Sequence, residues 1–385
     1  SISIYCSMKI HKLIFLATLI SSCSNESINE ELTLNVLENQ SVHFRPSDDS
    51  NAFNNNSREI VLGSGRLILK KIQLPIKNKF RHAEASIRLV STGDPWDKSG
   101  SFFILPSSDF SNLESKTNGI SSLIGSDGQP PLELLRFITP FGIGYFNNKE
   151  RIQKLKPVYI PEWEDDILWK EDISQLIPIL KGEVWVGFYI DTWSDKGWEV
   201  DVNIMFNDQA SGRSNKKIVS LINTTPLMSN QNGYDQFGIK PLTQTFELQK
   251  NAKNVDLYYL TTGHGGHSTG DEFVKKNNII SLNGEVIKEF IPWRNDCASF
   301  RRFNPSSGVW TEKAEWKGEE IEERIASSDY SRSGWCPGSK VSPKIINLGA
   351  LKKGTHEISV FIPNAQITTE REFNFWNVST YIIYN

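Results

Sequence analysis

Short runs of strand-forming residues follow one another through most of this chain, separated at close intervals by Gly, Asn, Asp or Pro. The clearest runs span 59–62, 66–74, 85–90, 101–105, 182–190, 198–206, 255–260, 278–282 and 356–362. Runs of β-branched or alternating apolar residues bounded by turn residues are typical of antiparallel sandwiches. Helical signal is confined to about 172–177, where Pro178 ends it, and there is no repeat and no βαβ alternation. The pattern predicts an all-β fold.

The length of the chain favours two domains. A chain of 385 residues is long for a single hydrophobic core, even after an N-terminal segment is set aside. The polar, Gly- and Ser-bearing segment at 207–216 follows a strong strand and is the best boundary. We expect two jelly-roll sandwiches side by side, at 32–210 and 211–385.

The N-terminal segment has the features of an export signal. From Met8, a basic start leads into an apolar run at 13–20 and then small residues before Cys23. The run is shorter than the roughly 20 residues that span a bilayer. We expect 1–22 to comprise upstream residues and a lipoprotein-like signal peptide, Cys23 to be lipidated, and 23–31 to be a tether. The protein is then exported and lipid-anchored at the periplasmic face or cell surface, or released from it; an ordinary cleaved signal with a chance cysteine is the alternative.

The remaining cysteines form one candidate pair. Cys6 precedes Met8 and Cys23 is assigned to the lipid, so Cys297 and Cys336 are left. An exported protein meets an oxidising environment in which a disulfide persists. A zinc site is the competing interpretation, but two isolated cysteines without CxxC spacing do not favour it.

Charge and aromatic content limit the choice of partners. The net charge of −3 comes without a basic cluster, so the chain lacks the footprint of a nucleic-acid-binding protein. Eleven tryptophans suit a surface that stacks on sugars, although packing is the commoner role of any single tryptophan. We expect a monomer.

Two loops near the C-terminus carry the candidate chemistry. The segment 262–273 is Gly-rich and ends in the acidic pair Asp271-Glu272, and the segment 331–338 carries Arg332 and ends in Trp335-Cys-Pro-Gly. A loop that presents a carboxylate, beside a basic loop held by a disulfide, is a reasonable beginning for an active site.

With these pieces placed, the chain resembles the peptide-N-glycosidase F family, the bacterial peptide-N4-(N-acetyl-β-glucosaminyl)asparagine amidases. The matching segments are 96–97, 136–140, 189–193, 271–273, 293–305, 327–338 and 375–379. The resemblance covers the chain from about residue 32 to its end. It implies two eight-stranded antiparallel jelly rolls and hydrolysis of the amide between an N-linked glycan and asparagine. It also implies N-glycopeptides or N-glycoproteins as substrates and no metal or other cofactor.

Three catalytic acids follow from the resemblance. An amide hydrolase without a metal or a nucleophilic Ser or Cys needs a carboxylate to activate water and groups that polarise the carbonyl and protonate the nitrogen. The acid of the family's Trp-Asp pair matches Asp97, which is expected to act on the scissile linkage or its water. The acid after the glycine loop matches Glu272, with Asp271 as its rival, in the role of a water-mediated acid–base partner. Asp191 stands where the family has glutamate.

Substrate contacts follow from the same comparison. Arg332 matches a family arginine, and its guanidinium can hold an amide oxygen or a sugar hydroxyl by paired hydrogen bonds. Trp193 can stack on the first N-acetylglucosamine. His264, near which the family typically has a tryptophan, and Lys98, beside Asp97, complete the expected set.

Each of these residues also has an ordinary structural interpretation. Asp97 could form a turn, Asp191 could end a strand and bind nothing, Arg332 could be a solvated loop charge, and Trp193 could pack in a core. Among functions, a non-catalytic glycan-binding lipoprotein is the main alternative, and the aspartate at position 191 favours it.

A copper monooxygenase shares the pair of jelly rolls but needs several histidines and a methionine across both domains. The mature chain contains only His43, His82, His264, His267 and His356, without a His-x-His pair. The sequence therefore does not favour a metal site.

Overall fold

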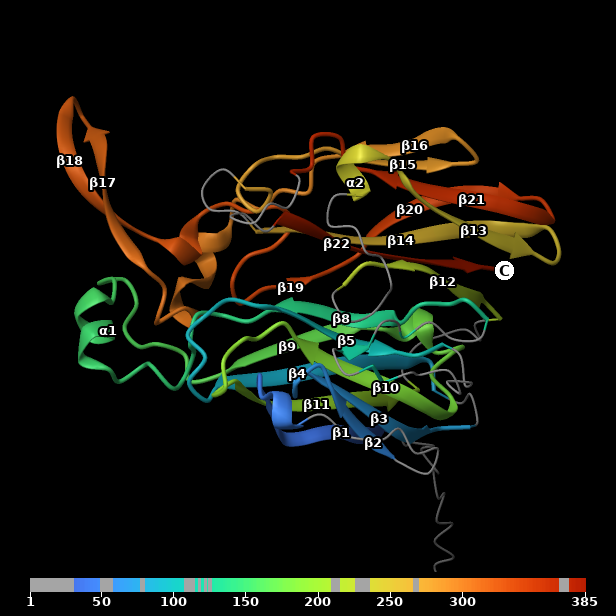
Figure 1. Ribbon diagram of the computed structural model, residues 1–385, viewed down its shortest axis with the longest axis horizontal. Coiled ribbons are helices and arrows are strands. Elements are labelled where there is room, and N and C mark those ends of the chain that lie inside the picture. The colour runs from blue at the N-terminus through green and yellow to red at the C-terminus, as the bar shows by residue number, and fades with distance from the viewer. Residues whose placement is uncertain are drawn as a thin grey trace, which may run out of the picture.

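The structure is a computed structural model that describes residues 31–48, 58–76, 80–106, 115–116, 119–120, 123, 127–208, 215–225, 236–265, 270–366 and 374–385. Strands dominate this part of the chain, and they pair antiparallel in two sandwiches that lie side by side (Figure 1). The predicted fold class is confirmed. All nine expected strand runs are strands, and the short helical segment is the 3-10 turn η2 (Ser174–Leu176).

The first sandwich packs a four-stranded sheet on a six-stranded sheet. The four-stranded sheet runs in the order β1 (Glu31–Val42), β11 (Trp198–Asn207), β4 (His82–Ser91) and β9 (Ile167–Asp172). The six-stranded sheet runs in the order β19 (Lys340–Val341), β8 (Leu132–Ile138), β5 (Ser99–Ile104), β10 (Gly182–Ile190), β3 (Leu67–Leu74) and β2 (Glu59–Leu62). Along β4 buried and half-buried positions alternate, which is the period that one buried face imposes on a strand. Phe102, Phe188 and Trp198 are among the buried residues that fill the core.

The second sandwich packs two four-stranded sheets. One sheet is β12 (Lys217–Asn223), β22 (Asn374–Tyr384), β14 (Ala252–Gly265) and β20 (Lys344–Leu351). The other is β13 (Leu242–Leu248), β21 (Gly354–Phe361), β15 (Asn278–Leu282) and β16 (Glu285–Phe290). Leu257, Ile280 and Ile358 are part of its core.

The two sandwiches share a buried boundary. Every residue of β22 is buried: some of its side chains, such as Ile382, belong to the second core, and others, such as Ile383, pack in the first. The short strand β19 comes from the C-terminal half yet pairs with β8 of the first sandwich. Arg136 on β8 donates from Nη1 to the carbonyl of Asn377 on β22 at 2.7 Å. These contacts fix the two sheets that meet at the boundary.

Two insertions project from the same end of the molecule (Figure 1). One carries the helix α1 (Glu150–Leu155), and the other is a hairpin of β17 (Val309–Trp316) and β18 (Glu319–Ala326). The smaller elements are η1 (Pro46–Asp48), β6 (Ser115–Lys116), β7 (Gly119–Ile120), α2 (Gln236–Ile239), η3 (Cys297–Phe303) and η4 (Ser327–Asp329).

The expected domain boundary at 210–211 stays a prediction; β11 ends at Asn207 and β12 begins at Lys217, on either side of it. Cys23, the signal segment and nearly all of the tether lie outside the described residues. In the part of the chain that is described, no helix has both the length and the apolar character needed to cross a membrane.

Candidate active site

A tight turn ahead of β5 positions Asp97. Asp94 anchors this turn: its Oδ1 accepts a hydrogen bond from the Trp96 amide at 3.0 Å. Its Oδ2 accepts hydrogen bonds from Thr192 Oγ1 at 2.5 Å and from Trp198 Nε1 at 3.0 Å. Asp94 is fully buried, whereas the Asp97 side chain is 17 % exposed. The turn-forming role therefore belongs to Asp94, and Asp97 points to the basic loop.

The glycine loop separates its two adjacent acids. Asp271 is buried, and its Oδ2 accepts hydrogen bonds from Trp376 Nε1 at 3.0 Å and from the Gln366 amide at 2.9 Å. The Glu272 amide donates to the Gly265 carbonyl at 3.3 Å, and its carboxylate remains 16 % exposed. Asp271 thus fixes the loop, and Glu272 is the acid whose carboxylate meets Arg332; its catalytic role stays a prediction.

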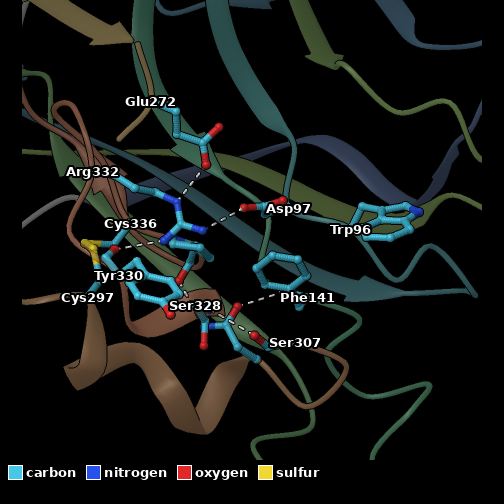
Figure 2. A network of polar contacts seen from close by, with 12 residues as sticks. Trp96, Asp97, Phe141, Glu272, Cys297, Ser307, Ser328, Tyr330, Arg332 and Cys336 are labelled. Atoms are coloured by element: carbon cyan, nitrogen blue, oxygen red, sulfur yellow. Dashed lines mark hydrogen bonds and ion pairs between the residues drawn. A yellow bond between two sulfur atoms is a disulfide. The ribbon is translucent and has the colours of Figure 1, made fainter. Parts of the chain in front are cut away.

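Arg332 joins the two carboxylates (Figure 2). Its Nε donates to Glu272 Oε1 at 2.9 Å, and its Nη2 lies 3.7 Å from Asp97 Oδ2. Its Nη1 donates to the Tyr330 carbonyl at 2.9 Å. The guanidinium carbon lies 4.9 Å from the ring centroid of Phe273. With 1 % of the side chain exposed, Arg332 is a buried charge and the alternative of a solvated loop residue is wrong.

The disulfide between Cys297 and Cys336 is formed, with the two Cα atoms 5.1 Å apart. Beside it, the backbones of Arg294 and Arg332 exchange two hydrogen bonds, at 2.8 and 3.0 Å. The loop is therefore held from both sides, which fixes the guanidinium between the two acids.

Burial and charge shift the titration of both acids. Burial raises the pKa of Glu272 to about 7; the charge of Asp97 acts in the same direction and Arg332 opposes it. Burial also raises the pKa of Asp97, against the opposing charges of Arg332 and Lys98. Two neighbouring acids, one of them poised near neutral pH, are suited to dividing the roles of proton acceptor and proton donor.

Asp191 lies beside the start of β5. It follows β10, and its amide donates to the Ser99 carbonyl at 2.9 Å. Its Oδ1 accepts a hydrogen bond from the Tyr189 hydroxyl at 2.8 Å and lies 3.5 Å from Arg66 Nη1. Asp191 is therefore held by two side chains, whereas the structural alternative from the sequence was an acid that ends a strand and binds nothing. Sequence reasoning assigned no role to Tyr189, although it lies in the matching segment 189–193, and none to Arg66, which no local motif marks.

Trp193 is at the surface next to this cluster. Its side chain is 62 % exposed, so the core-packing alternative is wrong. The guanidinium carbon of Arg66 lies 4.5 Å from its ring centroid, and the ring of Phe44 lies 5.0 Å away, centroid to centroid. An indole steadied from two sides and open to solvent can stack on a sugar ring. Trp96, beside Asp97, is a second exposed indole that sequence reasoning did not assign (Figure 2).

His264 is packed under the glycine loop. Its ring stacks between Trp335 and Phe375, at centroid distances of 5.2 and 5.0 Å, and its Nε2 lies 2.7 Å from Thr262 Oγ1. Burial, followed by the charges of Arg136 and Lys98, lowers its pKa to about 3, so the ring is neutral. At 6 % exposure it offers little surface to a substrate and mainly supports the loop.

Lys98 follows Asp97 and is held by its backbone. Its amide donates to Thr139 Oγ1 at 2.8 Å, and its carbonyl accepts from the Thr139 amide at 2.8 Å. Its positive charge opposes the burial that raises the pKa of Asp97, and it adds to the burial that lowers the pKa of His264. Among the described residues, no three His, Cys, Asp or Glu side chains gather into a group that could hold a metal; His267 lies outside them.

Comparison with known proteins points to one family. The model of the N-terminal domain of peptide-N-glycosidase F matches residues 33–206, and the model of its C-terminal domain matches residues 234–383. A comparison with curated proteins found no match.

Solved structures agree with these matches. A structure of PNGF-II is 32 % identical to this chain with a TM-score of 0.77, and the match covers 92 % of this chain and 65 % of PNGF-II. This chain thus spans about two thirds of the length of that relative. PNGase F from Flavobacterium meningosepticum, described as a glycosylasparaginase, is 16 % identical with a TM-score of 0.59, and the match covers 92 % of this chain and 96 % of that one. At that identity the likeness shows the fold.

Proposed function

This chain belongs to the peptide-N-glycosidase F family, and we propose that it is an amidase that hydrolyses the bond between an N-linked glycan and asparagine. Its products would be a glycosylamine and a peptide with aspartate in place of asparagine. One observation carries the proposal: Asp97 and Glu272, which come from different sandwiches, lie on either side of the buried guanidinium of Arg332.

The three residues divide the work of amide hydrolysis. Asp97, when ionised, accepts a proton from the attacking water or orients the scissile linkage. Glu272, with its pKa near 7, carries a proton that it can deliver through water to the departing nitrogen. Arg332 holds both side chains and stabilises the negative charge that develops near them. Each positioned acid–base group typically contributes about 10²–10⁴ in rate.

The glycan is proposed to lie on the side of Asp191 and Trp193. The exposed indole of Trp193 offers a stacking surface for the first N-acetylglucosamine, and Asp191 can accept hydrogen bonds from sugar hydroxyls. Asp191 is one methylene shorter than the glutamate of the family, so a bridging water would complete the contact. The printed descriptions of PNGase F as a glycosylasparaginase and an asparagine amidase support this class of substrate.

We also propose that the protein is exported and anchored to a membrane by a lipid. The signal-like segment before Cys23 supports export and lipid anchoring, which would place the enzyme where N-glycoproteins from outside the cell are met. Mass spectrometry of the membrane fraction, read for a lipid on the Cys23 peptide, tests this.

Replacing Asp97 by Asn tests the proposed chemistry. We expect Asp97→Asn to lower kcat/KM for release of a glycan from an N-glycopeptide by at least about 10²-fold, with the fold intact. Asp195→Asn is the control, because Asp195 is an exposed acid that pairs loosely with Lys196 at 3.9 Å. Full activity in Asp97→Asn would refute the site. Tight glycopeptide binding without release by the unaltered chain would instead establish the glycan-binding alternative.

A further inference from the structure

The hairpin β17–β18 has two chemically distinct faces. Strand pairing places Trp310 opposite Ile325, Glu312 opposite Glu323, and Ala314 opposite Ile321. Because side chains alternate between faces, these residues and Glu319 share one face. The basic residues of the two strands, Lys313 and Arg324, fall on the opposite face, where Lys313 Nζ pairs with Glu320 Oε1 at 2.7 Å. The first face, here called the acidic–apolar face, therefore carries apolar groups and three carboxylates without a basic residue.

The acidic–apolar face is linked to the active site. Glu312 accepts a hydrogen bond from the hydroxyl of Tyr330, and the carbonyl of Tyr330 accepts one from Arg332 at 2.9 Å. At the base of the hairpin, the Ser328 amide donates to Ser307 Oγ at 3.0 Å (Figure 2). The hairpin is thus continuous with the loop that carries Arg332, and its acidic–apolar face is bonded to that loop through Glu312.

Strand order puts the hairpin and the glycan-side residues on opposite sides of Asp97. In the six-stranded sheet β5 lies between β8 and β10. Asp191 follows β10, whereas the hairpin base contacts the end of β8 and the Asp97 turn: Ser306 donates from its amide to the Phe141 carbonyl at 3.0 Å and from Oγ to the Pro95 carbonyl at 2.7 Å. A substrate cleaved at Asp97, with its sugar beside Trp193, would extend its other part toward the hairpin.

The exposed surface of the face needs a partner. Trp310 and Ile321 are 53 % and 40 % exposed, and a two-stranded ribbon alone is only marginally stable in water. The tip is a tight turn at Lys317-Gly318, where both residues have positive φ. Within the described part of the chain, Trp310 and Ile321 on this face remain exposed to solvent. An extended peptide with apolar and basic side chains would cover the indole and neutralise Glu319 and Glu323.

From these observations we infer that the acidic–apolar face of the hairpin binds the peptide that flanks the glycosylated asparagine, with a preference for apolar and basic residues. This deepens the proposed function, on which it rests, by naming the part of the substrate that the hairpin recognises. Trp310 and Ile321 supply the apolar contact, and Glu312, Glu319 and Glu323 supply the charge preference.

The test measures binding of two labelled glycopeptides that carry the same glycan. One has only an Asn-X-Thr peptide, and the other is extended on both sides by alternating Lys and Leu. Binding is read by fluorescence anisotropy in the Asp97→Asn background, so that turnover does not consume the ligand. We expect the extended glycopeptide to bind about tenfold more tightly, the size of effect that a well-placed Trp contact gives. An extended glycopeptide with Glu in place of Lys should lose this advantage.

Hairpin variants decide whether the advantage comes from this face. Trp310→Ala with Ile321→Ser should bring the two dissociation constants within about twofold, and Glu323→Gln alone should weaken the preference for Lys over Glu. Glu322→Gln, on the opposite face, is the matched control and should retain the full advantage. Equal affinity of the two glycopeptides for the intact hairpin, or an advantage that survives in the Trp310→Ala/Ile321→Ser variant, would overturn the inference. Glycan release from the short glycopeptide by the unaltered chain is measured in parallel; its absence would count against the proposed function and leave the binding comparison valid.

Discussion

Arg332 combines almost complete burial with two carboxylates in ion-pair range. A buried guanidinium without partners would be costly, so the two acids stabilise it and it holds them in place. The sequence allowed these three residues to be predicted through the family resemblance, which rests on the order in which the Trp-Asp pair, the glycine loop and the Trp-Cys-Pro-Gly loop occur. It could not identify Arg66, which meets Asp191 across a separation of 125 residues, since only the folded sheet brings them together.

The titration of Glu272 predicts how glycan release depends on pH. Its pKa of about 7 means that the proton-donating form is lost as pH rises through 7, so glycan release should fall on the alkaline side with a midpoint near 7. Glu272→Gln should lower activity and abolish this limb. Because the charge of Asp97 helps to raise the Glu272 pKa, Asp97→Asn should lower it. Carboxyl ¹³C NMR titration of both forms measures the shift, and an unchanged or raised pKa in Asp97→Asn would contradict the coupling.

The loops that carry the site lie at the ends of strands, and the strands were the easier part to predict. A buried strand leaves either an alternating or a continuous apolar run in the sequence. Each of the nine predicted runs shows one or the other; the run at 101–105 is continuous, and its strand β5 is buried throughout. The hairpin β17–β18 was not predicted because almost none of its side chains are buried. Its sequence contains six glutamates, two lysines and an arginine, so the apolar residues do not alternate clearly with polar ones. The helix α1 was missed for a similar reason, since only Ile152 of its six residues is buried.

The disulfide is expected to stabilise both the fold and the loop that carries Arg332. Cys297 and Cys336 are 39 residues apart, and on the chain-entropy model closing such a loop stabilises the fold by about 4 kcal/mol. The variant Cys297→Ser/Cys336→Ser should lose stability of this order in urea unfolding. It should also lose glycan release, because Arg332 lies four residues before Cys336. An unchanged unfolding midpoint with full activity would show that the loop does not depend on the disulfide.

At the scale of the whole molecule, the site exists only because two sandwiches meet. Asp97 belongs to the first sandwich and Glu272 to the second, so neither sandwich alone carries both acids. The sequence predicted the pair of sandwiches but not the strand β19, whose two residues, Lys340 and Val341, are too few to show a period. The contacts that join the sandwiches were equally hidden, because they pair residues far apart in the chain.

The ion pair of Glu133 and Arg136, both on β8, is buried at the boundary between the sandwiches, where Arg136 also donates to the Asn377 carbonyl on β22. Arg136 Nε donates to Glu133 Oε2 at 2.9 Å. Burial alone would raise the pKa of Glu133, but Arg136 brings it below its ordinary value, so the carboxylate is ionised. Arg136→Met leaves that charge without its partner and should cost about 3–5 kcal/mol in urea unfolding.

Two further variants complete this test. Adding Glu133→Gln to Arg136→Met should recover much of the loss, because the unpaired charge is removed. Arg302→Met, which breaks the exposed pair of Arg302 with Glu164, is the control and should cost less than about 1 kcal/mol. Equal losses for Arg136→Met and Arg302→Met would contradict the role of the buried pair.

The proposed function is cleavage of the amide that joins an N-glycan to asparagine. The most direct measurement incubates the purified protein with a defined N-glycopeptide in water enriched in ¹⁸O and analyses the products by mass spectrometry. We predict an intact glycan and a peptide in which asparagine has become aspartate with one ¹⁸O. A peptide that retains asparagine with one N-acetylglucosamine, or folded protein that gives no product, would contradict the account.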